Sequence, residues 1–283
     1  MSPQPGSGGP PSRRRWHDIG VRSVSGLALI VVALASTQAG GLAFTLVWLV
    51  AAIIVQWEWQ RIVDSPGAGA RIVVGTVGTV IAAAVPTKLA DTLLVLVCCA
   101  IVSALLARPG RRLWAAAGIV YGGAFLAALL LLRASFPFGM RSIFWLFATV
   151  WSVDVFAYLG GRLIGGPKLW PRISPSKTWS GTLCGVVAGG AFGTFVALRD
   201  TSVPTALAPV LVLSLATAIV SQVGDGFESA MKRRFSVKDS SRIIPGHGGV
   251  LDRLDGFMAA TLFAFLFGLA RNMPPAVGLF YWA

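Results

Sequence analysis

Charged residues gather in one short stretch of the chain, Gly224–Gly256. Five of the eleven acidic residues lie there, and so do six of the twenty-four basic ones. Apolar runs flank this stretch on both sides, Ala206–Val223 before it and Phe257–Ala270 after it. Because a charge at the edge of a hydrocarbon layer is costly, charges kept at such an edge usually hold an ion or an anionic substrate. We therefore take this stretch as the first candidate site.

Four carboxylates in the stretch share one spacing. Asp225 and Glu228 lie three residues apart, with Lys232 four residues further on, and Asp252 and Asp255 repeat the spacing at the start of the last long apolar run. Residues at this spacing share a helix face, and carboxylates at two helix ends suit Mg²⁺, which prefers oxygen ligands and often shares substrate phosphates. The same acids could instead form salt bridges with neighbouring Lys and Arg. Spacing alone leaves both interpretations open.

A glycine-rich segment, Ile244–Gly249, lies between the two acidic pairs. Gly246, Gly248 and Gly249 surround His247, and such glycines let the backbone approach a ligand and direct N–H groups at an anion. An ordinary glycine-rich turn has the same composition. His247 could act as an acid or base, as a hydrogen-bond donor or as a structural residue.

A second polar segment, Asp154–Gly181, precedes the first. Ser174, Lys177 and Thr178 provide hydroxyl groups and one ammonium group, which suit phosphate oxygens; a helix entry with an interfacial lysine would look similar. Asp154 lies near the end of its apolar run, and an acid in such a position is a candidate functional residue.

Composition indicates an integral membrane protein. Hydrophobic residues make up 55% of the 283 positions, charged residues 12%, and the mean hydropathy is +0.74, whereas soluble domains carry about 25% charged residues. The apolar runs are long and do not alternate, which favours helices over a barrel. We expect an all-α polytopic membrane protein of about nine transmembrane helices, over Val24–Thr37, Gly41–Trp57, Ile72–Val85, Leu89–Leu106, Leu113–Leu132, Ile143–Leu159, Gly181–Leu198, Ala206–Val223 and Phe257–Ala270.

The basic residues predict the orientation of these helices. Nineteen of the 24 Lys and Arg fall in alternate connections that include both polar segments, and five fall on the other side. By the positive-inside rule, the N-terminus and both polar segments are expected to be cytoplasmic. The same rule accounts for the net charge of +13 without nucleic acid. We expect residues 1–23 to form a disordered basic cytoplasmic segment and residues 24–283 a single transmembrane catalytic domain.

The stretch Ser229–Asp255 closely resembles the signature of the phosphatidate cytidylyltransferases, also called CDP-diacylglycerol synthases. That signature has Ser, Lys-Arg, Lys-Asp and then Pro/Gly-x-His-Gly-Gly-x-x-Asp-Arg-x-Asp, and the chain satisfies each position. The second polar segment departs from the family at Ser176 and Ser180, where Lys and Glu are common. It agrees at Asp154, Ala157-Tyr158, Gly161-Arg162, Ile173-Ser174-Pro175 and Lys177-Thr178. The specific resemblance covers roughly residues 151–256, and upstream it rests on hydropathy.

The resemblance implies a Mg²⁺-dependent transfer of CMP from CTP to phosphatidate at a bacterial-type cytoplasmic membrane, giving CDP-diacylglycerol and pyrophosphate for phospholipid biosynthesis. It implies CTP, phosphatidate and membrane lipid as partners, without nucleic acid, and it is compatible with a homodimer. Asp225 and Asp252 would be metal ligands, and Glu228 would be a supporting acid. The implied catalytic residues are Asp225, Asp252, Lys232, Asp239 and Asp255; the implied substrate-binding residues are Ser174, Lys177, Thr178, Arg233, Lys238, His247, Gly248, Gly249 and Arg253.

Two other classes of protein share parts of this pattern. CDP-alcohol phosphotransferases also begin their signature with Asp-Gly, but they continue with Ala-Arg, where this chain has Ala230-Met231, and their last two acids are four residues apart rather than three. An ion-coupled transporter would carry acids near the bilayer midplane on interrupted helices in two related halves. Here the charges lie beside connections in the second half only.

Overall fold

The computed structural model describes residues 11–84, 89–199, 205–246 and 248–282, and within residues 11–22 it describes the backbone only. The described chain is almost entirely helical, as expected, with one 3₁₀ helix and one small sheet. Its elements are α1 Pro11–Ala39, α2 Gly41–Asp64, η1 Ser65–Gly67, α3 Ala68–Ala84, α4 Leu89–Leu106, α5 Arg112–Ala134, α6 Gly139–Leu163, β1 Lys168–Trp170, β2 Ser174–Thr178, α7 Trp179–Arg199, α8 Leu207–Arg234, α9 Leu251–Ala270 and α10 Pro275–Phe280.

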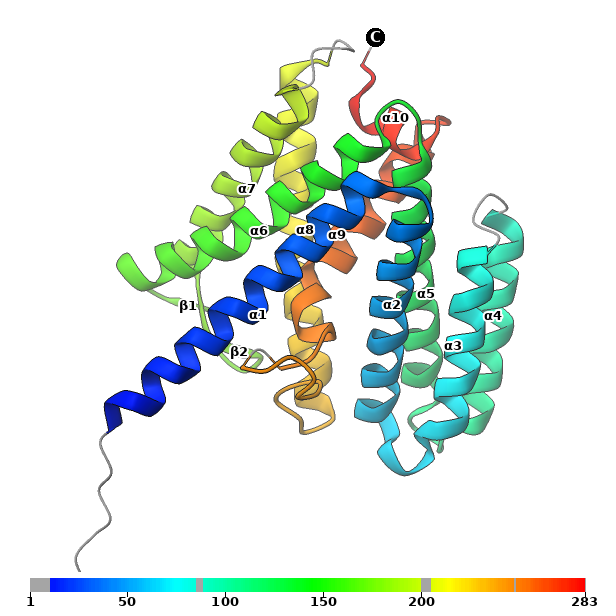
Figure 1. Ribbon diagram of the computed structural model, residues 1–283. Coiled ribbons are helices and arrows are strands. Elements are labelled where there is room, and N and C mark those ends of the chain that lie inside the picture. The colour runs from blue at the N-terminus through cyan, green and yellow to red at the C-terminus, as the bar shows by residue number, and fades with distance from the viewer. Residues whose placement is uncertain (1–10, 85–88, 200–204, 247, 283) are drawn as a thin grey trace, which may run out of the picture.

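Each of the nine expected apolar runs overlaps one of the helices α1–α9. By length and composition, seven helical segments of the described residues could cross a membrane. One of them, Gly41–Ala84, is 44 residues long and turns back on itself at η1, so that α2 and α3 lie side by side (Figure 1). The apolar part of α1, Ser23–Ala39, is shorter. The structure is that of a polytopic helical membrane protein, and the exact number of spans stays a prediction.

The structure differs from expectation in two segments. Helix α1 begins at Pro11, so that residues 11–23 are helical where the sequence predicted disorder. Part of the second polar segment, β1 and β2, forms an antiparallel pair of short strands, in which Lys168 pairs with Thr178 and Trp170 with Ser174. This hairpin connects α6 to α7 and lies at the same end of the bundle as the α8–α9 connection (Figure 1).

An aromatic cluster joins three helices in the core. The Trp48 ring on α2 stacks on Phe147 of α6 and Phe257 of α9, with ring centroids 6.1 and 5.4 Å apart. All three side chains are buried. Because stacked aromatic rings bury a large apolar area in a fixed geometry, this cluster ties the first third of the chain to the helices that carry the signature.

Glycines bring α7 close to α6. A Cβ added at Gly181 would lie 2.5 Å from the carbonyl oxygen of Ala157, and one added at Gly185 would lie 2.8 Å from that of Val153. These glycines are four residues apart, as in the small-residue contacts of membrane helices. The close approach places the hairpin before α7 directly beside the end of α6.

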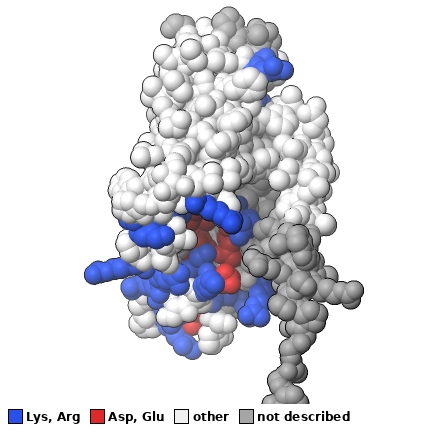
Figure 2. Space-filling model, turned by 90° about the vertical axis from the view of Figure 1, so that its left-hand side faces the viewer, with Lys and Arg blue, Asp and Glu red and all other residues white. Residues whose placement is uncertain are grey.

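Successive helices run in alternate directions, so alternate connections lie at the same end of the molecule (Figure 1). The η1 turn, the hairpin and the α8–α9 connection share one end, and Figure 2 shows most of the visible Lys and Arg side chains gathered on that half. This clustering matches the alternation of basic residues along the sequence, on which the expected orientation rests.

The expected orientation can be tested by thiol labelling. In a background without the native Cys98, Cys99 and Cys184, we expect Phe136→Cys to react with a membrane-impermeant maleimide on intact cells, and Lys238→Cys to react only after permeabilisation. Phe136 is 90% exposed between α5 and α6, and Lys238 is exposed in the α8–α9 connection. Equal labelling of both positions in intact cells would contradict the orientation.

Candidate active site

A cavity of about 520 Å³ opens between α6, β2, α7 and α8. Asp154 of α6, Lys177 of β2 and Asp225 of α8 line it. From the side on which α6, α7 and the hairpin lie, Figure 2 shows acidic side chains inside a hollow that Lys and Arg side chains surround. The two polar segments of the sequence therefore meet at one cavity.

Asp225 and Lys177 form the closest ion pair of this cavity. The Lys177 ammonium lies 2.6 Å from Asp225 Oδ2 and donates at 3.4 Å to Gln222 on the same helix as Asp225. The Asp225 side chain is still 31% exposed, so that one face of its carboxylate can be reached from the cavity.

Two further carboxylates lie within electrostatic range of Asp225. They belong to Asp154 and to Asp255, which comes from the first turns of α9. Three carboxylates from three helices thus lie within electrostatic range of the Lys177 ammonium, and Arg253 also acts on Asp154. Such a mixture of acidic and basic groups suits a substrate phosphate accompanied by a cation.

A second charged group lies beside the cavity. The Lys232 ammonium lies 2.7 Å from Glu228 Oε2 and 2.8 Å from Asp252 Oδ1. All three side chains are largely buried, Glu228 at 3% exposure and Asp252 at 8%. Since a buried charge without a partner is costly, Lys232 holds the end of α8 against the start of α9 through both acids.

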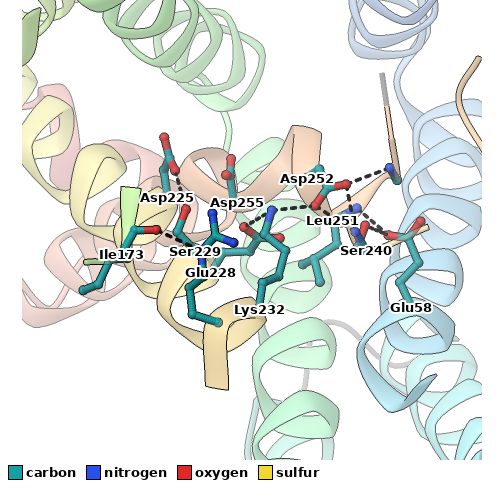
Figure 3. Close-up of polar contacts among 12 residues, drawn as sticks. Glu58, Ile173, Asp225, Glu228, Ser229, Lys232, Ser240, Leu251, Asp252 and Asp255 are labelled. Atoms are coloured by element: carbon teal, nitrogen blue, oxygen red, sulfur yellow. Dashed lines mark hydrogen bonds and ion pairs between the residues drawn. The ribbon is translucent and has the colours of Figure 1, made fainter. Parts of the chain in front are cut away.

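Asp252 is also bound by the backbone of the α8–α9 connection. The amide of Ser240 donates to both of its carboxylate oxygens, at 3.1 and 3.0 Å, and the amide of Gly249 donates to Oδ2 at 2.9 Å. Together with Lys232, these donors occupy both oxygens. Figure 3 shows Asp255 between Asp225 and Asp252, so that the two expected metal ligands belong to neighbouring groups.

The described residues contain no group of three or more His, Cys, Asp or Glu side chains arranged to hold a metal ion. The assignment of Asp225 and Asp252 as metal ligands therefore stays a prediction. Mg²⁺ is often held by one or two carboxylates together with substrate phosphates, so a complete cage of protein ligands is not required.

Glu58 of α2 is the residue that the sequence analysis missed. It is fully buried, and its carboxylate accepts hydrogen bonds from the hydroxyls of Ser240 and Ser241 and from the amides of Val250 and Leu251. Figure 3 shows it reaching the signature from the opposite side to Asp225. An acid inside an apolar run, which is itself a functional signal, could have pointed to it.

Two glycines of the signature make room for these carboxylates. Gly248 has a φ of +82°, a conformation that favours glycine, and a Cβ there would lie 2.6 Å from Asp252 Oδ2. A Cβ at Gly249 would collide with the Ser240 hydroxyl and with Glu58. In this structure the Gly249 amide is directed at Asp252, while His247 lies outside the described residues.

The remaining predicted residues surround this centre. Thr178 is buried at the start of α7, where its hydroxyl accepts the Gly181 amide at 3.1 Å and so caps the helix. The Arg233 guanidinium donates to the carbonyl of Ile173 at 3.3 Å, which links α8 to the hairpin. Ser174 is half-buried in β2, and the exposed residues are Arg233, Lys238, Asp239 and Arg253.

A cavity lined by acidic and basic side chains, at one end of a helical membrane bundle, provides charged groups that can stabilise charge developing on a bound substrate. A family profile described as the cytidylyltransferase family matches residues 20–270. The chain belongs to this family of nucleotidyltransferases. The match begins upstream of the signature and includes α2 with Glu58.

Curated relatives align along most of the chain. A protein of Brucella abortus biovar 1 (strain 9-941), named phosphatidate cytidylyltransferase, is 38% identical over 266 residues, which cover 93% of this chain and 97% of the relative. A Brucella suis biovar 1 (strain 1330) protein of the same name is 40% identical, covering 87% of this chain and 92% of the relative. One from Staphylococcus epidermidis (strain ATCC 12228 / FDA PCI 1200), also so named, is 44% identical over 124 residues, 42% of this chain and 46% of the relative.

Lys232 should be required for stability. We expect Lys232→Met to lower the free energy of unfolding by about 3 kcal/mol, because it leaves Glu228 and Asp252 buried without their shared counter-ion. Thermal unfolding of the purified protein in detergent measures the effect. Lys168→Met, at an exposed lysine of β1, is the matched control and should change stability little; equal losses in both variants would contradict the buried-pair account.

Proposed function

We propose that this protein transfers CMP from CTP to phosphatidate, giving CDP-diacylglycerol and pyrophosphate. The family match and the names of relatives that align over most of the chain support this activity. The observation that carries the proposal is the cavity in which Asp225 and Lys177 meet, at the end of helices long and apolar enough to cross a membrane. Such a position gives access to a soluble nucleotide and to a lipid.

The chemistry requires two polyanions to be brought together. The phosphate of phosphatidate is largely ionised near neutral pH and can attack the α-phosphorus of CTP without a strong general base. Charge repulsion between the substrates is then the main barrier, and cationic groups placed where charge accumulates lower it. Lys177 lies in the cavity, and Arg233 and Arg253 lie near it; their charges can bind phosphate oxygens and orient the attacking oxygen.

Asp225 is the residue best suited to hold Mg²⁺. Its carboxylate is partly exposed in the cavity, Asp154 and Asp255 lie within electrostatic range, and carboxylate oxygens are the ligands that Mg²⁺ prefers. Asp252 fits less well, because a metal ion would have to displace Lys232 or the amides of Ser240 and Gly249. When bound, Mg²⁺ would neutralise substrate phosphates.

The lipid reaches the site sideways from the bilayer. CTP reaches it from the cytoplasm, because the site lies at the cytoplasmic face of the bacterial inner membrane. Tyr158 lines the cavity and is 63% exposed, and the next residue, Leu159, is 41% exposed. These exposed side chains offer apolar surface beside the cavity for the acyl chains of phosphatidate. The basic residues gathered at this end of the molecule (Figure 2) support the cytoplasmic orientation.

The activity is tested with purified protein, labelled CTP, phosphatidate and Mg²⁺. A lipid-soluble cytidine product that requires all three components is expected. Its absence from folded protein that retains its helical spectrum and its thermal transition would overturn the proposed function.

Asp225→Asn should reduce turnover by at least about a hundredfold, the size of loss typical for a group that stabilises charge in the transition state. The substitution keeps the shape of the side chain and removes the charge that faces Lys177. Asp91→Asn is the matched control, since Asp91 is an exposed acid in the first turn of α4; it should keep near-normal turnover. Normal activity of Asp225→Asn would remove Asp225 from the catalytic centre.

A further inference from the structure

The carboxylate of Glu58 connects a helix of the first half of the chain to the signature. Its Oε1 accepts the Ser241 hydroxyl at 2.5 Å and the Val250 amide at 3.0 Å, and its Oε2 accepts the Ser240 hydroxyl at 3.1 Å and the Leu251 amide at 2.6 Å. The donors lie 182 to 193 residues away in sequence. Each carboxylate oxygen thus accepts one hydroxyl and one backbone amide.

Two of these hydrogen bonds satisfy backbone amides at the start of α9. The residue at its N-cap, Val250, makes no side-chain cap of its own, and the first amides of a helix have no partners within the helix. Three consecutive amides are shared between two carboxylates: Gly249 donates to Asp252, and Val250 and Leu251 donate to Glu58. A negative charge at this position is also stabilised by the helix dipole.

Ser240 couples the two carboxylates. Its amide donates to Asp252, and its hydroxyl donates to Glu58. The beginning and the end of the segment from Ser240 to Leu251 are therefore held by the same Glu58 side chain. Asp252 in turn contacts Lys232, so a continuous set of hydrogen bonds leads from α2 to the end of α8 (Figure 3).

We propose that Glu58 is a positioning residue of the active site. Its carboxylate anchors the α8–α9 connection and the first turn of α9, and so holds Asp252 against Lys232 and fixes where Asp255, one turn further along α9, stands beside Asp225. The catalytic consequence rests on the proposed function, whereas the anchoring does not. Glu58 touches no cavity-lining residue in these contacts and acts through Asp252 and Asp255.

Glu58→Gln is the sharpest test of this role. A glutamine keeps the size of the side chain but offers one acceptor oxygen and one amide group. Because each oxygen of Glu58 accepts a backbone amide, either orientation of the glutamine places its NH₂ group against an N–H of Val250 or Leu251. Glu58→Asp keeps both acceptor oxygens and moves them back by one methylene.

Hydrogen exchange and kinetics give two separate readouts. In Glu58→Gln we expect the amides of Ser240 and of residues 249–251 to exchange about tenfold faster or more, because buried amides without acceptors open more readily. We expect kcat to fall by about tenfold or more while the KM for CTP changes within about threefold. In Glu58→Asp we expect smaller changes in both amide exchange and kcat. If Glu58→Gln does not fold, the same two measurements are made on Glu58→Asp.

Asp64→Asn is the matched control. Asp64 is a buried acid at the end of the same helix, where it pairs with Arg71 at 3.5 Å, away from the α8–α9 connection. The same change from carboxylate to amide should lower the thermal stability of the protein. It should leave the amide exchange rates at residues 249–251 within about twofold of wild type, and kcat likewise.

Unchanged exchange at residues 249–251 in Glu58→Gln would overturn the anchoring. Faster exchange with normal kcat would overturn the positioning role. Loss of kcat to the same extent in Asp64→Asn would also overturn it, because the effect would then be one of general stability. If wild-type protein makes no lipid-soluble cytidine product, the proposed function fails on its own, and the exchange comparison still decides the anchoring.

Discussion

The structure depends on how charges at the ends of apolar helices are compensated. Lys232 lies between Glu228 and Asp252. Glu58 is compensated by four neutral donors, two hydroxyls of the α8–α9 connection and two amides at the start of α9. Without these contacts the same carboxylates would be buried at a cost of several kcal/mol each. With them, the charges fix the angle and register at which α2, α8 and α9 meet.

The carboxylates of the site differ in how fully they are compensated. Both oxygens of Asp252 have donors, whereas Oε1 of the neighbouring Glu228 is buried without a hydrogen-bond partner. In the cavity, Lys177 pairs with Asp225, and both Lys177 and Arg253 lie within electrostatic range of Asp154. The Asp225 carboxylate is partly exposed and can be reached from the cavity, next to the hydrogen-bonded group around Asp252. Such preorganisation is what electrostatic catalysis requires.

Much of the fold could be predicted from the sequence, because long apolar runs permit few alternatives in a bilayer. The residues of the two polar segments were also found, since charges are rare elsewhere in the chain. Their grouping was not found. The equal spacing of Asp225–Glu228 and Asp252–Asp255 suggested one shared ion, which stays a prediction. The spacing did not indicate that Asp225 pairs with Lys177 while Asp252 pairs with Lys232. Helical spacing reports which side chains share a face, but only packing reports which face meets which.

Glu58 shows the same limit from the other direction. Its partners lie in a segment far along the chain, and nothing local distinguishes it from the structural acid Asp64 six residues later on the same helix. Gly249 becomes informative only once Glu58 and the segment of its partners are placed together, since the missing side chain of Gly249 leaves the space that the Glu58 carboxylate fills. The family match, which extends from residue 20 to residue 270, is then understandable in physical terms. The signature needs α2 as well, because the amides of Val250 and Leu251 at the start of α9 are satisfied from there.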